Sequence, residues 1–192
     1  MDIQYDLGGD YKNDDKTYKK CTEMIVQDGV PYSLILKKSS RILYRSTQTG
    51  LRPLVECIEK NKGKKGCTLY DKIIGLAAAK LIVYSGIIKT VFTPIASVPA
   101  LQFLEKNKIK IQPLATVPSI LNLPKTDLCP FEKKAQTIHD PIEFYETIKK
   151  IFLFAGKTSS CSVALYIIFS YDILNILIGK KIMPILWPII HG

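Results

Sequence analysis

The chain of 192 residues is 47% hydrophobic and 23% charged, and its net charge at pH 7 is +10. Its length leaves room for one domain with extensions, and its apolar content excludes a wholly disordered protein. The five cysteines are widely spaced and form no C-x-x-C pair, so they indicate neither a zinc ribbon nor a disulfide framework. We therefore expect a folded protein of a reducing compartment, the cytoplasm.

Charge and hydrophobicity divide the chain into three parts. Residues 1–29 are polar with a net charge of −3, which predicts a mobile arm and not the apolar leader of a secretory signal. Residues 30–152 have a net charge of +11 and hold the predicted domain. Residues 153–192 form an apolar C-terminal tail with a net charge of +2.

The domain begins with a predicted hairpin and a helix. The short apolar runs Tyr32–Lys37 and Ile42–Ser46 are joined by a polar turn, which is typical of an antiparallel β-hairpin. Apolar residues at helical spacing then surround Pro53, a residue suited to a first turn. They predict a helix that ends at Asn61–Gly63.

Strands and helices alternate over the rest of the domain. This alternation indicates right-handed crossovers and a mostly parallel sheet covered on both faces, to which the hairpin adds one antiparallel strand. The expected fold class is therefore α/β, a three-layer α/β/α sandwich. The predicted elements are a strand at Cys67–Tyr70, a helix from about Lys72 to Ser85, a strand at Thr90–Thr93, a helix at Pro99–Asn107, a strand at Ile109–Leu114, and a last helix from Asp140 to Phe152 behind a capping box.

The apolar tail does not continue this pattern. Val163–Ile178 is almost continuously apolar but contains Asp172, and Ile182–Ile190 contains two prolines. A membrane-spanning helix needs about 20 apolar residues, and a central acid costs roughly 2.5–3.5 kcal/mol on insertion. Three alternatives remain open: membrane contact through residues 163–190, packing on the domain or a partner, and an aberrant extension of the gene model.

Two segments carry residues suited to binding or catalysis. Asp71 and Lys72 follow a predicted strand, at the edge where open α/β sheets bind ligands; the structural alternative is a helix cap and a solvated lysine. Cys129 precedes Pro130 at a predicted helix N-cap, where the helix dipole favours a thiolate, and Asp127 lies nearby. A buried structural thiol is the alternative for Cys129.

Two other motifs carry no chemistry. Gly156-Lys157-Thr158 lacks the earlier glycine and the preceding strand of a phosphate-binding loop. The two histidines, His139 and His191, are too few for a His-rich zinc site.

Four separated stretches of the domain occur in the same order in one protein family. They are Gly50-Leu51-Arg52-Pro53-Leu54, the run from Tyr70-Asp71-Lys72 to Ala79, Thr126-Asp127-Leu128-Cys129-Pro130, and Asp140-Pro141. On these motifs, residues 32–152 resemble a small, mostly prokaryotic family of unknown function with a cytidine-deaminase-like fold. The chain departs from the family at Asn122-Leu123-Pro124-Lys125, where the family pattern is closer to N-R-x-G.

The resemblance implies a fold without a deaminase activity. Deaminases have an H-x-E or C-x-E motif at the start of the second core helix and a P-C-x-x-C motif at the start of the third; these residues hold zinc and supply the acid–base glutamate. At these places the chain has Tyr70-Asp71-Lys72 and Ser97-Val98-Pro99-Ala100, so we expect no metal and no cofactor.

The sequence thus predicts a zinc-independent domain that binds or transforms a nucleobase-like or other small ligand. The candidate site consists of Asp71 as a base or acceptor, Lys72 as an anion contact, Cys129 as a nucleophile, and Asp127. The alternative is a binding module for RNA or an acidic protein partner, although few aromatic residues accompany the lysines. Its contact lysines would be Lys37, Lys38, Lys60, Lys62, Lys64 and Lys65. A third possibility is a regulatory protein that uses the tail as its contact surface; the oligomeric state stays open.

Overall fold

A computed structural model of the chain describes residues 26–27 and 30–155. The chain divides into two units, Met1–Glu146 and Thr147–Gly192. The first unit holds the α/β domain, and the described part of the second is the end of helix α6 (Pro141–Ala155). Residues 156–192 of the predicted tail (153–192), with the proposed membrane contact at 163–190, and most of the predicted arm lie outside the described residues; residues 153–155 belong to α6.

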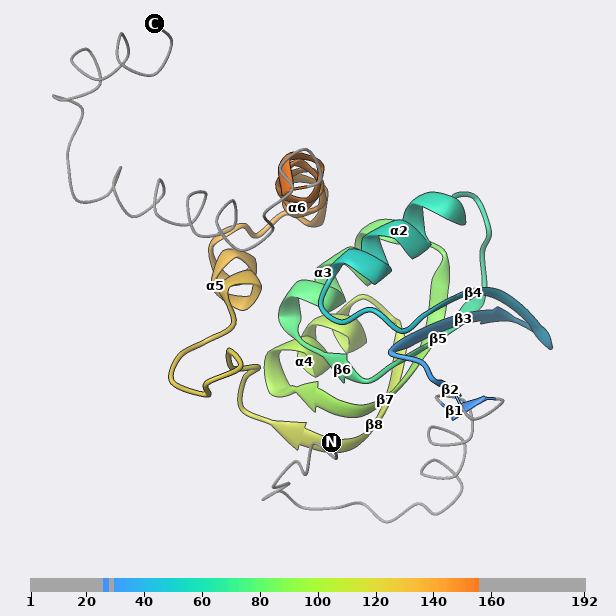
Figure 1. The fold of residues 1–192 in the computed structure, drawn as a ribbon, viewed down its shortest axis with the longest axis horizontal. Helices are drawn as coiled ribbons and strands as arrows, with labels where there is room; N and C mark the ends of the chain where they lie inside the picture. Colours follow the sequence, from blue (N-terminus) through green and yellow to red (C-terminus); the bar gives the residue numbers. More distant parts are fainter. Residues whose placement is uncertain (1–25, 28–29, 156–192) are drawn as a thin grey trace, which may run out of the picture. The chain divides into compact units, whose positions relative to one another are not determined.

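A mixed sheet forms the centre of the domain (Figure 1). β3 pairs antiparallel with β4 on one side and with β5 on the other, whereas β7 pairs parallel with β5, β6 and β8. Tyr70 is opposite Phe92 and Ile73 is opposite Ile95, so β6 continues β5 along one edge of β7. The order across the sheet is thus β4, β3, β5 with β6, β7, β8. The strands are β3 (Leu34–Lys38), β4 (Arg41–Ser46), β5 (Cys67–Asp71), β6 (Ile73–Ile74), β7 (Ile88–Ser97) and β8 (Lys110–Val117).

The leading hairpin and the parallel strands behind it confirm the predicted mixed α/β sheet. The hairpin is β3–β4, which turns at Ser39 with a φ of 53°. A separate two-stranded sheet pairs β1 (Val26–Gln27) with β2 (Val30–Pro31) just before it.

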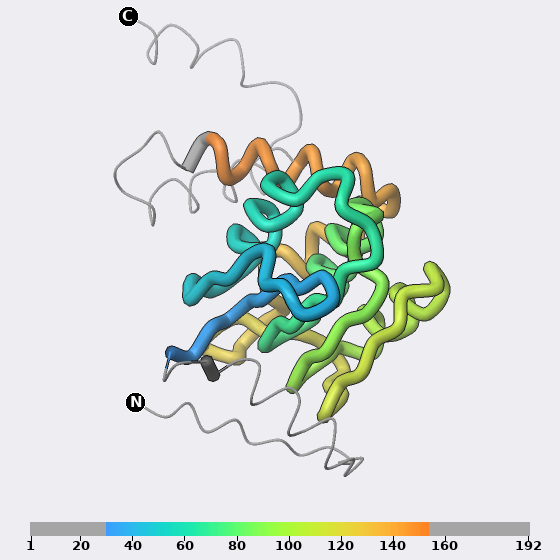
Figure 2. The backbone as a smooth tube through the Cα atoms, turned by 90° about the vertical axis from the view of Figure 1, so that its right-hand side faces the viewer, coloured from blue at the N-terminus to red at the C-terminus, as the bar shows by residue number. Residues whose placement is uncertain are grey.

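The connecting helices lie on one face of the sheet (Figures 1 and 2). They are α2 (Arg52–Lys60), α3 (Leu76–Ser85) and α4 (Val98–Lys106). The connections β5–α3–β7 and β7–α4–β8 advance in the same direction across the sheet, so right-handed crossovers bring both helices to the same face. The small buried residues Ala77, Ala78 and Ala79 let α3 approach its neighbours closely, and Gly86 ends it in the predicted left-handed conformation.

The prediction that this helix starts at Lys72 is wrong. Ile73 and Ile74 extend along β7 as β6, and Gly75 is also extended, so α3 begins at Leu76. β-branched isoleucines favour such a strand. The strand that they pair with lies about twenty residues further along the chain, at Ile95–Ala96. The local signals that predict a helix start carry no information about so distant a partner.

The opposite face of the sheet is also apolar and buried. Ile35, Tyr70 and Phe92 are direct neighbours on three adjacent strands, and the Tyr70 and Phe92 rings stack with centroids 5.1 Å apart. Tyr70 and Phe92 are each only 5% exposed. A helical layer on this face is not among the described residues, so the three-layer sandwich stays a prediction.

Two further helices complete the described chain, α5 (Pro130–Thr137) and α6. The predicted cap of α6 is confirmed, because the Asp140 carboxylate accepts hydrogen bonds from the amides of Ile142 and Glu143. The ammonium group of buried Lys80 in α3 donates hydrogen bonds to the carbonyls of Ile138 and His139, which follow the end of α5. Burial lowers the pKa of Lys80. This contact fixes α5 beside α3, where the candidate site lies.

Within the described residues, no helix has both the length and the apolar character needed to cross a membrane.

Candidate functional site

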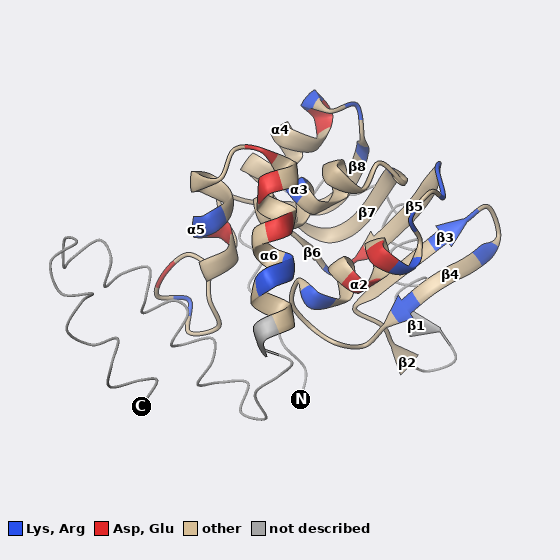
Figure 3. Cartoon of the chain, turned by 90° about the horizontal axis from the view of Figure 1, so that it is seen from above, with Lys and Arg blue, Asp and Glu red and all other residues tan. Residues whose placement is uncertain are grey.

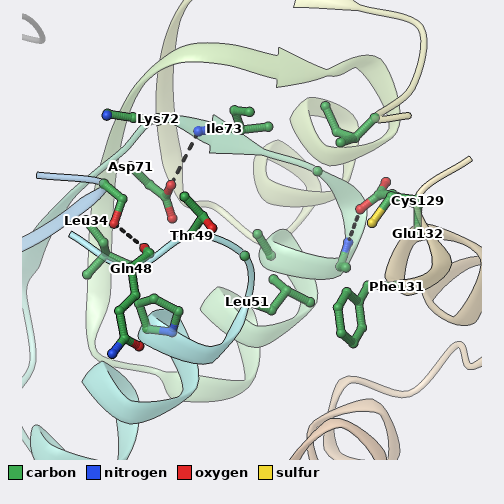
Figure 4. A pocket seen from close by; sticks show the side chains of 17 residues that line it. Leu34, Gln48, Thr49, Leu51, Asp71, Lys72, Ile73, Cys129, Phe131 and Glu132 are labelled. Atoms are coloured by element: carbon green, nitrogen blue, oxygen red, sulfur yellow. Dashed lines mark hydrogen bonds between the residues drawn. The ribbon is translucent and has the colours of Figure 1, made fainter. Parts of the chain in front are cut away.

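A pocket of about 220 Å³ opens at the carboxyl ends of β4 and β5 (Figure 4). This is the edge at which open α/β sheets bind ligands. The N-termini of α3 and α5 and the loop between β4 and α2 form the rest of its wall. Much of the wall is apolar; these residues are Leu34, Leu51, Pro53, Ile73, Ile120 and Phe131.

Asp71 is the polar group at one end of the pocket. It is the last residue of β5, and its carboxylate turns into the pocket and accepts a hydrogen bond of 3.3 Å from the amide of Ile73 (Figure 4). Although part of the side chain stays accessible, the carboxylate lies among protein atoms, and this desolvation raises its pKa from 3.8 to about 7. Asp71 can therefore gain or lose a proton near neutral pH.

Lys72 belongs to the wall of the same pocket but does not point into it. Neighbouring residues of an extended chain point to opposite sides, and the ammonium group of Lys72 turns away from the Asp71 carboxylate (Figure 4). Its side chain is exposed. This orientation does not fit the predicted anion contact.

Cys129 lies toward the other end of the pocket, at the N-cap of α5 (Figure 4). The preceding loop holds it there: the Asn122 side-chain oxygen accepts from the amides of Thr126 and Asp127, and the Cys129 amide donates to the Ile120 carbonyl at 3.0 Å. The predicted N-cap is thus confirmed. Asp71 and Cys129 line one pocket at opposite ends, so a ligand has to span the space between them to meet both.

Asp127 lies outside the pocket wall. Its exposed carboxylate forms an ion pair with Lys133 and accepts from the Leu128 amide at 2.7 Å. The hydrogen bond from Lys133 lowers the pKa of Asp127. The structure therefore gives Asp127 a role in shaping the turn that carries Cys129.

Glu132 is the main site residue that the sequence did not reveal. It is 5% exposed, and its two carboxylate oxygens accept from the amides of Leu76 and Ala77 at 3.0 and 2.9 Å. A carboxylate from α5 thereby caps the N-terminus of α3, where unpaired amides and the helix dipole favour negative charge. Burial raises the pKa of Glu132, while the two amide bonds act in the opposite direction.

The β4–α2 loop supplies the remaining polar atoms of the wall. Ser33, 8% exposed, donates to backbone carbonyls at the end of β4 and in this loop, those of Ser46 and Gln48. Gln48 and Thr49 follow, and Gly50 and Leu51 are the first residues of the family motif quoted above. That family motif is the sequence signal from which this part of the pocket wall could have been predicted.

Metal ligands do not meet in the described part of the chain: it contains no group of three or more His, Cys, Asp or Glu side chains placed to hold an ion. The residues at the start of α3 are Gly75, Leu76 and Ala77, and Ser97 caps α4 through its hydroxyl. These side chains do not fit the zinc ligands of a deaminase.

Cys129 is expected to react with iodoacetamide at least about 100-fold faster than Cys57 at pH 8. Cys129 is half-buried, whereas Cys57 and Cys67 are fully buried. Burial raises the pKa of Cys57 to about 12, so almost no thiolate forms there at pH 8. Peptide mass spectrometry over a time course separates the individual cysteines. Slow, equal labelling of all three would contradict a reactive Cys129.

The fold and the pocket define the class: an α/β domain whose mixed sheet carries a small pocket at the carboxyl ends of its strands. The family model "TM1506: Domain of unknown function (DUF1893)" matches residues 23–152. The chain belongs to the DUF1893 family, which confirms the predicted membership in a family of unknown function.

A solved structure has the same fold. It is the DUF1893 family protein TM1506 from Thermotoga maritima, which superposes with a TM-score of 0.62 at 23% sequence identity, over 70% of this chain and 89% of that one. No curated protein matches the chain.

Proposed function

We propose that this chain is a zinc-independent domain of cytidine-deaminase-like type that binds a small, planar, nucleobase-like ligand in the pocket between Asp71 and Cys129. The observation that carries the proposal is the pocket itself, which combines apolar walls with a carboxylate able to exchange a proton near pH 7. Three unpaired thiols in the described residues, at Cys57, Cys67 and Cys129, favour a cytoplasmic location.

The architecture supports the deaminase-like type. A leading antiparallel hairpin precedes alternating strands and helices, and both faces of the sheet carry buried apolar residues, as a sandwich with two helical layers requires. Glu132 also brings a carboxylate to the start of the second core helix, α3. Deaminases have their acid–base glutamate at that helix start, within the helix itself.

The charges around the pocket favour a ligand that donates hydrogen bonds. Asp71 and Glu132 are acceptors, and Lys72, the one basic residue in the described wall, turns away. A phosphate would meet two carboxylates without a facing cation. An N–H or an amino group of a heterocycle can donate to Asp71, while Phe131 and the aliphatic side chains contact the flat faces of the ring.

The size of the pocket favours a single ring system. Its volume, about 220 Å³, is below the range of roughly 300–1,000 Å³ that is common for drug-sized ligands. A free base or the base of a nucleoside fits this volume better than a dinucleotide.

The test is a thermal-shift screen of the full chain against nucleobases, nucleosides and nucleotides. A ligand present at a hundredfold its dissociation constant stabilises by about 2.7 kcal/mol, which raises Tm by roughly 5–10 °C for a chain of this length. We expect bases or nucleosides to raise Tm and the corresponding nucleotides to do so less. Asp71→Asn should abolish the shift.

Asp127→Asn is the matched control, because it removes the same charge from a residue outside the pocket. It should leave the ligand-induced shift unchanged. A panel without any shift, or equal shifts in wild type and Asp71→Asn, would contradict the proposal.

A further inference from the structure

Eleven of the 20 basic residues between positions 30 and 152 lie at the end of the sheet opposite the pocket. The pocket lies at the carboxyl ends of the parallel strands, whereas the turns that lead into β5, β7 and β8 lie at their amino ends. The β3–β4 hairpin reaches the same end, because β3 runs antiparallel to β5 and Lys37 is opposite Thr68. We name this surface the basic edge; it comprises residues 37–41, 59–66, 86–90 and 105–110.

The basic edge holds almost all of the net charge of the chain. Its four segments contain 11 lysines and arginines and two glutamates, a net charge of +9, against +10 for the whole chain. Figure 3 shows the basic residues following this end of the domain from the α4–β8 turn to the β3–β4 hairpin. The basic residues are Lys37, Lys38, Arg41, Lys60, Lys62, Lys64, Lys65, Lys89, Lys106, Lys108 and Lys110.

Ten of these eleven side chains are accessible to a partner. Apart from Lys37, all the basic residues of the edge are exposed. One described ion pair lies within it, between Lys62 and Glu59 at 2.8 Å, and it is itself on the surface. Such a concentration of like charge costs repulsive energy that a bound polyanion would relieve.

The register of the sheet places two of these lysines on one line across the strands. Lys37 is opposite Thr68, Thr68 is opposite Thr90, and Thr90 is opposite Lys110, so lysines stand at both ends of one line across the strands. Neighbouring strands are about 4.8 Å apart, so Lys37 on β3 and Lys110 on β8, three spacings apart, are about 14 Å from each other. One strand of a duplex carries one phosphate for about every 3.4 Å of the helix axis. The distance between the two lysines therefore corresponds to about four phosphates along the duplex axis.

The composition of the edge indicates backbone contacts without base recognition. Ten of its 11 basic residues are lysines, which act as point charges, and Arg41 is the single arginine with the planar fork that reads guanine edges. Its four segments contain no aromatic side chain on which an unpaired base could stack. A duplex, with its bases already stacked, fits such a surface better than a single strand.

We infer that the basic edge binds the phosphate backbone of duplex nucleic acid, without sequence preference and independently of the pocket.

The test measures the affinity of the full chain for a short fluorescent RNA or DNA duplex by anisotropy at several salt concentrations. The edge variant is Lys65→Glu with Lys108→Glu. The matched control, Lys125→Glu with Lys150→Glu, changes the net charge equally at two exposed lysines outside the four segments of the edge. Circular dichroism verifies that both variants fold.

We expect the edge variant to bind about tenfold more weakly or worse, and the control to bind within about twofold of wild type. The slope of log affinity against log salt should become shallower by about 1.8, because two phosphate contacts are lost. Two duplexes of unrelated sequence should bind equally well.

Three results would overturn the inference. They are the absence of duplex binding at low salt, equal weakening by both variants, and binding to phosphatidylserine vesicles without binding to duplexes.

Discussion

Replacing Gly75 with alanine is expected to lower the free energy of unfolding by about 2–4 kcal/mol. An added Cβ would lie 2.3 Å from the Oε1 atom of Glu132 and 2.9 Å from the Cγ1 atom of Ile120. The carboxylate cannot move away without giving up the amides of Leu76 and Ala77, and it would then be buried without partners. Urea unfolding should show a lower midpoint with an unchanged slope.

A double-mutant cycle with Glu132→Ala identifies the cause. In that background the colliding carboxylate is absent, so Gly75→Ala should cost clearly less than it does in the wild type. The contact with Ile120 remains in both backgrounds and accounts for any residual cost. An equal cost in the two backgrounds would mean that the carboxylate is not the obstacle.

Replacing Asp71 with asparagine is expected to stabilise the protein at pH 8, by about 2–3 kcal/mol. Burial raises the pKa of Asp71 from 3.8 to about 7, so between these values the folded state binds this proton more tightly than the unfolded state. The stability from this group is fully present below pH 3.8 and is lost as the pH rises through 7. A tenfold change in proton affinity is worth about 1.4 kcal/mol, so the difference between the two pKa values limits the stabilisation by Asp71→Asn to about 4 kcal/mol. Partial exposure of the side chain reduces this value.

The measurement is the difference in unfolding free energy between Asp71→Asn and wild type from pH 4 to pH 8. The difference should grow with pH and level off above 7. Asp127→Asn is the control of opposite sign, because the pKa of that exposed carboxylate is lowered and its stabilising effect is lost as the pH falls. A pH-independent difference for Asp71→Asn would contradict a raised pKa.

The elements that local signals specify were predictable. The hairpin, the last helix with its Asp140 cap, and the N-cap position of Cys129 all depend on residues within a few positions of each other. The start of α3 was not predictable, because Ile73 and Ile74 form a strand only through pairing with β7, which is distant in the sequence.

The candidate site was predictable only in part, for the same reason. Asp71 ends β5, and Cys129 reaches the same pocket because α5 is held beside α3; the family motifs pointed to both residues. The sequence offers no sign that the Lys72 side chain turns away from the pocket. Its direction depends on where β5 ends and the extended chain continues into β6. Glu132 reads as an ordinary first-turn residue of α5, and its partners lie 55 and 56 positions earlier in the chain.

The capping of α3 by Glu132 also decides which ligands can use that helix end. A helix N-terminus with open amides binds phosphates and carboxylates readily. Here the amides of Leu76 and Ala77 are already occupied by an anion that belongs to the chain itself. A tethered group competes at a high effective concentration, about millimolar even on a flexible linker, and this one is held rigidly. Free anions are therefore outcompeted at this position by a permanent internal ligand.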